Sequence, residues 1–170
     1  MSETLEPALP DNLDEQAERL MHRLCDRKLT VTTAESCTGG MLAALLTDIE
    51  GEGHGFDRGF VTYSKESKTD LLGIEPDLLD HNDAVSEVVA RVMAEGALKR
   101  SKAYLALGIT GFAGPAGSDH EEGLVHMALA RRNGRTVHRE QHFGPIGRGA
   151  IRVKSLKAML DMLEQALEEE

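Results

Sequence analysis

The sequence predicts an α/β fold, a three-layer α/β/α sandwich with a mixed, mostly parallel sheet. Short segments rich in β-branched residues alternate with longer segments whose apolar residues recur at helical spacing. Residues 104–110 are mostly apolar, which is typical of a strand buried on both faces by covering helices. Asn133-Gly134 separates two further strand-like segments and indicates an antiparallel hairpin, so we expect the sheet to be mixed.

The length of the chain, 170 residues, is typical of one domain. We expect residues 1–11, which contain two prolines, to form a mobile tail and residues 12–170 to form a single domain. The formal net charge of −10 argues against a general nucleic-acid binder, because affinity for phosphate backbones comes mainly from lysine and arginine.

The spacing of cysteines, histidines and apolar residues argues against several other classes of protein. Two cysteines do not make a disulfide framework, and no Cys or His spacing typical of a metal site occurs, so we expect no metal. No apolar run approaches the roughly 20 residues of a membrane span. The acidic N-terminus lacks the pattern of a signal peptide. We therefore expect a cytoplasmic protein without a membrane partner.

In the first half of the chain, predicted helices and strands alternate. Leucine, alanine and methionine at helical spacing predict a helix over residues 12–26. A short β-branched run predicts a buried strand at 29–32, and the Ala/Leu-rich run that follows predicts a helix at 39–49. Glycines mark a loop at 51–59, and aromatic and β-branched residues predict a strand at 60–63.

The second half continues this alternation and adds the hairpin. Gly73 ends a short predicted helix that begins at Ser64, and Pro76 begins another. The remaining predicted elements are a helix from residue 86, a strand at 104–110, a glycine-rich loop at 111–119, strands at 124–130 and 136–143, and a helix at 150–168.

Small polar residues and two glycines separate the first predicted strand from the helix that follows it. The first N–H groups of a helix have no partner within the helix and carry the positive end of its dipole. A nucleophile at this turn, such as Ser36, would therefore lie beside ready donors for an anionic oxygen. Alternatively, Ser36 or Thr38 is simply the N-cap residue of the helix.

Three polar loops each follow a predicted strand and would meet at one edge of the sheet if those strands are parallel neighbours. The loops comprise residues 35–40, 63–68 and 110–118. This arrangement would bring the Ser36 hydroxyl together with the Lys68 amine, Tyr63 and Thr110. A serine needs a base before it attacks a carbonyl, and a lysine can serve when burial lowers its pKa. Ser-Lys pairs are a known variant of the catalytic triad.

Each of these side chains also has a purely structural interpretation. Lys68 could be a solvated helix residue, and Tyr63 could be packing at a strand end. Cys37 could itself be the nucleophile, because thiols at helix N-termini have lowered pKa values, or it could be buried and inert. Arg148 and Arg152 could clamp a phosphate at the start of the last helix, or could be exposed surface residues.

Four ordered sequence motifs span most of the chain. They are Ala34-Glu35-Ser36-Cys37-Thr38-Gly39-Gly40, Tyr63-Ser64-x-x-x-Lys68-x-x-Leu71-Leu72-Gly73, Ala84-Val85-Ser86-Glu87-x-Val89-Ala90 and Gly108-Ile109-Thr110-Gly111-x-Ala113-Gly114-Pro115. Over roughly residues 13–167 the chain resembles the C-terminal domain of the competence/damage-inducible protein CinA, a family that includes stand-alone nicotinamide-nucleotide amidohydrolases.

The resemblance implies a deamidase that converts nicotinamide mononucleotide and water to nicotinate mononucleotide and ammonia, in bacterial pyridine-nucleotide salvage. It implies no metal or organic cofactor. The family's catalytic serine and lysine correspond to Ser36 and Lys68, and we expect oxyanion support from Cys37, Thr38 and Gly39. Expected substrate contacts come from Glu35, Gly40, Tyr63, Thr110, Gly111, Gly114 and Arg148.

The expected partner is a small nucleotide substrate, with neither nucleic acid nor membrane, and small α/β domains of this kind often assemble as homo-oligomers. The alternative function is a non-catalytic nucleotide-binding or regulatory module of the same fold. Two features motivate that alternative. The loop at 116–118 reads Ala-Gly-Ser where the family carries a richer glycine run, and the region around Arg148 also departs from the family's pattern.

Overall fold

The structure is a computed structural model that describes residues 9–169. Its helices are α1 (Asp11–Asp26), α2 (Met41–Thr47), the short 3₁₀ helix η2 (Gly53–Gly55), α3 (Lys65–Leu72), α4 (Pro76–His81), α5 (Glu87–Lys99) and α6 (Arg148–Glu168). Its strands are β1 (Val31–Glu35), β2 (Phe56–Val61), β3 (Leu105–Gly111), β4 (Leu124–Arg131) and β5 (Val137–His142).

The five strands form one mixed sheet in the order β2-β1-β3-β4-β5. Strand β1 pairs in parallel with both β2 and β3, whereas β3–β4 and β4–β5 are antiparallel pairs. The carboxyl ends of β1, β2 and β3 therefore lie at the same edge of the sheet, where ligands bind in folds of this type.

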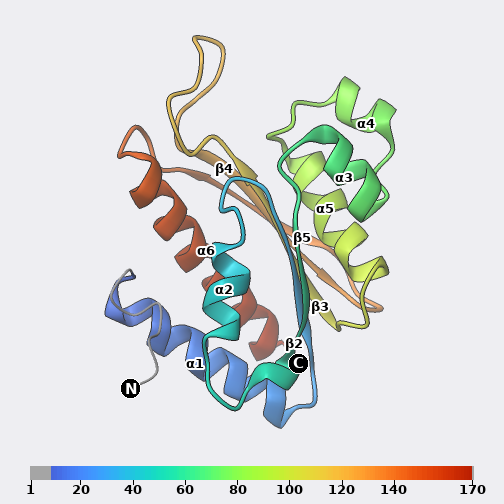
Figure 1. Cartoon of the computed structure of the whole chain (residues 1–170), viewed down its shortest axis with the longest axis vertical. Coiled ribbons are helices and arrows are strands. Elements are labelled where there is room, and N and C mark those ends of the chain that lie inside the picture. The colour runs from blue at the N-terminus through green and yellow to red at the C-terminus, as the bar shows by residue number, and fades with distance from the viewer. Residues whose placement is uncertain (1–8, 170) are drawn as a thin grey trace.

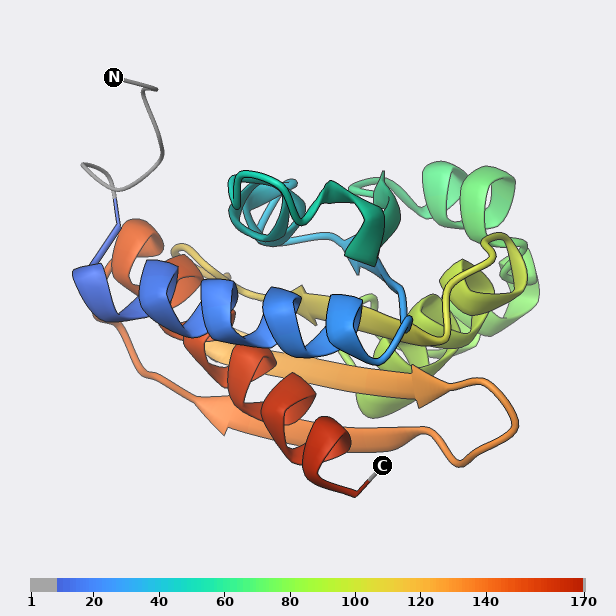
Figure 2. The same cartoon turned by 90° about the horizontal axis from the view of Figure 1, so that it is seen from below.

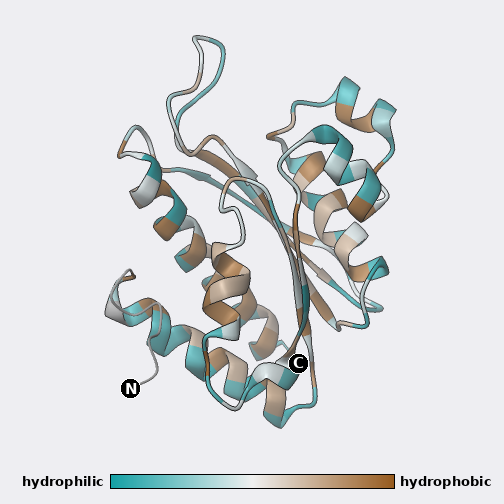
Figure 3. Ribbon diagram, viewed as in Figure 1, coloured by the Kyte–Doolittle hydropathy of each residue, from teal (hydrophilic) through white to brown (hydrophobic). Residues whose placement is uncertain are grey.

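Helices cover both faces of the sheet. Figure 1 shows α1, α2 and α6 on one side and α3, α4 and α5 on the other, and Figure 2 shows the same layers turned by 90°. One core cluster joins residues of α1, α2 and α6 to the sheet, and a second joins α3, α4 and α5 to its other face. In Figure 3, α2 and much of α5 have the hydrophobic colour. The predicted three-layer α/β/α fold is confirmed.

Several element boundaries differ from those expected. Strand β2 begins at Phe56, not at residue 60, and includes Gly59, which had indicated a loop. A Cβ at Gly59 would lie 3.0 Å from Thr33 Oγ1 and 3.1 Å from Ala43 Cβ, so this glycine serves close packing of α2 over the strand. Helix α2 begins two residues later than predicted, because Gly39 and Gly40 both have positive φ angles.

The expected mobile tail, residues 1–11, falls mainly on residues 1–8, which lie outside the described residues. Asp11, the last residue of the expected tail, is the first residue of α1. The hairpin predicted at Asn133-Gly134 is confirmed: it joins the antiparallel strands β4 and β5, and Asn133 has a φ angle of 64°. Among the described residues, no helix is long and apolar enough to cross a membrane.

Candidate active site

Ser36 is the first residue after β1, and neighbouring strands hold the chain on both sides of it. Its backbone N–H donates to Ile109 O at 3.0 Å, which extends the pairing of β1 with β3. On the other side, Thr62 N–H donates to Glu35 O at 2.8 Å and extends the pairing with β2. The position of the Ser36 hydroxyl is therefore fixed by two strands of the parallel part of the sheet.

The Lys68 amine lies beside this hydroxyl. Lys68 is in the second turn of α3, and Nζ is 3.3 Å from Ser36 Oγ, 2.8 Å from Thr62 O and 3.4 Å from Tyr63 O. The side chain is only 1% exposed, so the alternative interpretation of Lys68 as a solvated helix residue is wrong. Burial lowers the pKa of the Lys68 amine, because desolvation disfavours the charged form.

The carboxylate of Glu35 lies beneath the turn and faces the first turn of α2. Glu35 is fully buried and accepts backbone N–H hydrogen bonds from Gly40 at 3.2 Å, Leu42 at 3.0 Å and Ala43 at 2.8 Å. It also accepts from the Thr38 hydroxyl at 2.6 Å. These contacts satisfy amides that α2 itself leaves unpaired, and the negative charge suits the positive end of the helix dipole.

This geometry corrects the N-cap interpretation of the turn. The residue at the N-cap position is Gly40, which provides no side-chain hydrogen bond. Neither Ser36 nor Thr38 caps α2; the cap is the carboxylate of Glu35, five residues before Gly40. The Ser36 hydroxyl is therefore free to face Lys68.

The turn leaves two backbone amides for an anionic oxygen. Gly39 N–H donates to Ser36 O at 3.2 Å, so it is already used within the turn. Among the described residues, neither Cys37 N–H nor Thr38 N–H donates to a backbone carbonyl. Of the three residues expected to support an oxyanion, Cys37 and Thr38 therefore keep an N–H without a backbone acceptor, and Cys37 is the one of the three that lines the cavity over the site.

The Cys37 side chain is buried beside the serine. The pKa of the Cys37 thiol is raised to about 12, mainly by burial and in smaller part by the nearby Glu35 carboxylate. A thiol with such a pKa remains protonated near neutral pH, and the thiolate is the nucleophilic form. The environment of Cys37 thus disfavours it as the nucleophile and leaves Ser36 as the better candidate.

A cavity of about 320 Å³ opens over these groups. Its lining includes Ser36, Cys37, Tyr63, Lys68, Ala84, Val85, Thr110, Gly111, Phe112, Ala113, Gly114, Pro115 and Arg148. The loops after β1, β2 and β3 meet at one edge of the sheet, as expected for loops that follow parallel neighbouring strands. The volume lies at the lower end of the roughly 300–1,000 Å³ that is usual for small-molecule sites.

The other expected site residues have distinct positions. Tyr63 is 70% exposed at the rim of the cavity. The Thr110 hydroxyl donates to Ala84 O at 2.7 Å and so fixes the loop that precedes α5. Gly111 lies so close to β4 that an added Cβ would be 2.8 Å from a methyl group of Val125. Gly39, Gly40 and Glu35 belong to the turn itself and do not line the cavity.

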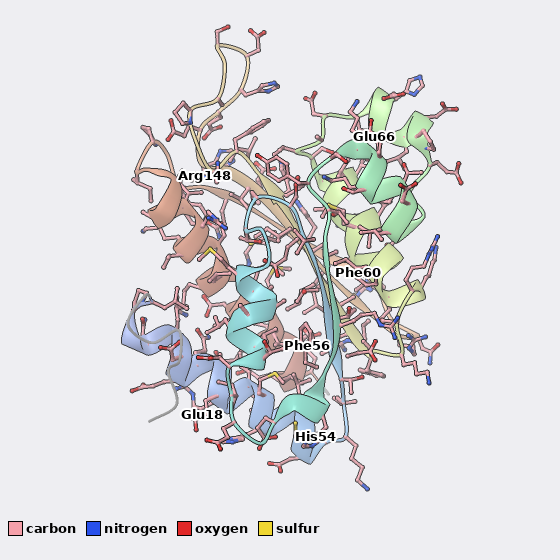
Figure 4. The ribbon with its side chains drawn as sticks, viewed as in Figure 1. Glu18, His54, Phe56, Phe60, Glu66 and Arg148 are labelled. Atoms are coloured by element: carbon pink, nitrogen blue, oxygen red, sulfur yellow. The ribbon has the colours of Figure 1, made fainter. Side chains whose placement is uncertain are left out.

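The two arginines of α6 point to different places. Arg148, the first residue of α6, is exposed and lines the cavity; Figure 4 labels it at the start of the helix. Arg152, one turn later, donates from Nη2 to Thr38 O at 2.7 Å and is not a cavity residue. Arg152 therefore holds the serine turn, whereas Arg148 is available to a ligand.

Comparisons with known proteins show the family to which the chain belongs. The sequence profile of the CinA C-terminal domain matches residues 13–167. The nicotinamide-nucleotide amidohydrolase PncC of Escherichia coli K12 is 42% identical over 151 residues, which is 88% of this chain and 91% of that protein. The chain belongs to the CinA C-terminal domain family.

Other members of this family are longer, and several have been solved. The CinA-like protein of Syntrophus aciditrophicus is 43% identical over 85% of this chain, and the chain spans about a third of that relative, 34% of its length. The crystal structure of the competence/damage-inducible protein CihA from Agrobacterium tumefaciens has a TM-score of 0.90 and 43% identity, and the match covers 99% of each chain.

In this CinA-family domain each of the four motifs contributes to the cavity. The first supplies Ser36, the second Lys68, the third Ala84 and Val85, and the fourth the residues from Thr110 to Pro115. The Thr62 carbonyl could not be predicted as a partner of the lysine, because a backbone acceptor has no side-chain signature. Phe112, which lines the cavity, was also missed, because the fourth motif leaves its position unspecified.

Proposed function

We propose that this protein is a nicotinamide-nucleotide amidohydrolase that hydrolyses the carboxamide of nicotinamide mononucleotide by a Ser-Lys mechanism. The observation that carries the proposal is the buried Lys68 amine, 3.3 Å from the Ser36 hydroxyl at the base of the cavity. The 42% identity to the amidohydrolase PncC of Escherichia coli, over most of both chains, supports the choice of reaction.

The three partners of the Lys68 amine suit a neutral base. Two of them, Thr62 O and Tyr63 O, are carbonyl oxygens that can only accept hydrogen bonds. A neutral amine has two protons for these two carbonyls, and its lone pair then faces the Ser36 hydroxyl. In this state Lys68 can accept the serine proton as the oxygen attacks.

The reaction then follows the usual course of acyl transfer. Ser36 Oγ forms a bond to the carboxamide carbon, and its proton passes to Lys68 Nζ. The amides of Cys37 and Thr38 stabilise the oxyanion. Lys68 returns the proton to the leaving nitrogen, the carbon–nitrogen bond breaks, and ammonia departs. Water, activated by the same lysine, then hydrolyses the ester on Ser36.

The cavity also has groups that suit the rest of the substrate. The nicotinamide ring of the nucleotide carries a positive charge, and Phe112 and Tyr63 offer aromatic faces for it. Arg148 lies at the first turn of α6, where a guanidinium and free helix amides together favour a phosphate. The 5′-phosphate would therefore bind at the cavity rim.

Ammonia release from nicotinamide mononucleotide tests the proposal, with Ser36→Ala and Cys37→Ala measured beside the wild type. Loss of the serine should lower kcat/KM by at least about 10³-fold. Cys37→Ala should retain most of the activity, because the proposed contribution of Cys37 is its backbone amide. The mechanism is wrong if Ser36→Ala keeps its activity, or if Cys37→Ala alone abolishes it. Saturable binding of the nucleotide without ammonia release from the wild type would favour the non-catalytic module.

A further inference from the structure

A second group of reactive side chains lies far from the cavity, at the amino-terminal edge of the parallel strands. Cys25 is near the end of α1, Glu52 is in the loop after α2, and His54 is in η2, just before β2 begins. The cysteine sulfur, a carboxylate oxygen of Glu52 and a ring nitrogen of His54 all lie within 4.8 Å of one another. Figure 4 shows His54 at the end of the molecule opposite Arg148.

Glu52 has an oxygen that the described protein does not satisfy. Its Oε1 is 3.3 Å from His22 Nε2, but the buried Oε2 has no hydrogen-bond partner among the described residues. A buried carboxylate oxygen without a partner is unfavourable, because it has lost its water and gained nothing in return. A cation bound beside it would remove this penalty.

The loop before β2 packs closely against the sulfur of Cys25. A Cβ at Gly55 would lie 2.8 Å from Cys25 Sγ and 3.0 Å from a Met21 methyl, so only glycine allows this approach. The thiol itself donates to Glu52 O at 3.6 Å. The backbone around Cys25 is therefore fixed, whereas His54 is exposed at the surface of the loop and can rotate toward the other two side chains.

We propose that Cys25, Glu52 and His54 bind a Zn²⁺ ion, with His22 as the fourth ligand. Sulfur, imidazole nitrogen and carboxylate oxygen are the ligands that zinc takes in tetrahedral sites. Zinc bond lengths of about 2.0–2.3 Å place ligand atoms roughly 3.5 Å apart. The atoms of Cys25, Glu52 and His54 lie within 4.8 Å of one another, and His22, outside that group of three, has its Nε2 3.3 Å from Glu52 Oε1, so all four side chains would rotate toward a common centre. His22 precedes Cys25 by three residues on α1, so both side chains lie on one face of the helix. On binding, the Cys25 thiol loses its proton to solvent and forms the zinc–sulfur bond.

Sequence spacing could not reveal this site, because its ligands come from two segments more than twenty residues apart, with no CxxC or HxxxH pattern. The expectation of no metal rested on those patterns and on the family resemblance, and neither tests for ligands that only the folded chain brings together. Bound zinc would join the end of α1 to the loop before β2, and would stabilise the layer of helices that α1 and α2 form. The zinc site is separate from the proposed amidohydrolase reaction, which takes place at the opposite edge of the sheet.

A zinc titration of the full chain tests this proposal. The protein is first stripped of metal with a chelator, and its affinity for Zn²⁺ is then measured by competition with a chromophoric chelator. We expect one Zn²⁺ per chain, and at least about tenfold weaker binding in Cys25→Ser, Glu52→Gln and His54→Gln. Two matched controls, Glu50→Gln in the same loop and His81→Gln on α4, should bind as the wild type does, because both side chains are exposed and outside the cluster.

The midpoint of thermal unfolding should rise with zinc in the wild type but not in Cys25→Ser.

Cobalt(II) provides an independent spectroscopic reading of the same site. A thiolate bound to Co²⁺ gives a charge-transfer band in the near ultraviolet, and this band should be present in the wild type and absent in Cys25→Ser. The proposal is overturned by a wild type that binds no zinc, by equal affinities of Glu52→Gln and Glu50→Gln, or by a cobalt complex without the thiolate band.

Discussion

Lys68 shows how a single buried side chain can determine the chemistry of the site. A lysine at its ordinary pKa is charged at neutral pH and cannot accept a proton, but burial lowers the pKa of this amine. The acid limb of the kcat/KM profile should therefore report protonation of Lys68, with the rate falling as pH falls through its lowered pKa. Lys68→Met should lower kcat/KM by about 10²–10⁴-fold. Lys65→Met, three residues earlier and exposed, is the matched control and should keep the profile.

Glu35 is a structural residue of the site. Glu35→Gln keeps the size of the side chain but replaces one acceptor oxygen by an NH₂ group. This NH₂ would face backbone N–H groups at the start of α2, which are themselves donors. We expect the free energy of unfolding to fall by about 3 kcal/mol, because hydrogen bonds to a charged group are among the stronger ones. Urea unfolding measures this change. Glu50→Gln, on the surface, should change stability by less than about 0.5 kcal/mol, and an equal loss in both variants would contradict the role given to Glu35.

At the scale of elements, helix α6 connects to the site at two points with different consequences. Arg152 holds the serine turn through Thr38 O, so Arg152→Met should lower kcat by roughly 10–100-fold with little change in KM. Arg148 lines the cavity, so Arg148→Met should mainly raise KM. Steady-state kinetics on the two variants separate these effects. A rise in KM alone for Arg152→Met would show that it binds substrate and does not position the turn.

At the scale of the whole molecule, much of the fold could be predicted from the sequence and less of the site. Apolar periodicity and the Asn133-Gly134 turn were sufficient for the layers and the mixed sheet, because both signals are local. The extent of β2 was missed because Gly59 serves packing between elements. The roles of Glu35 and Thr62 were missed for a similar reason, since each depends on backbone atoms that only the folded chain brings close. The expectation of a homo-oligomer stays a prediction.

The proposed mechanism requires Lys68 to be neutral beside Ser36 at the pH where the enzyme works. An NMR titration of lysine side chains labelled with carbon-13 at the ε position measures this directly, and Lys68→Met identifies the resonance of Lys68. We predict that this resonance titrates well below the other lysines, because burial lowers the pKa of the Lys68 amine. A Lys68 resonance that titrates together with the exposed lysines would contradict the mechanism.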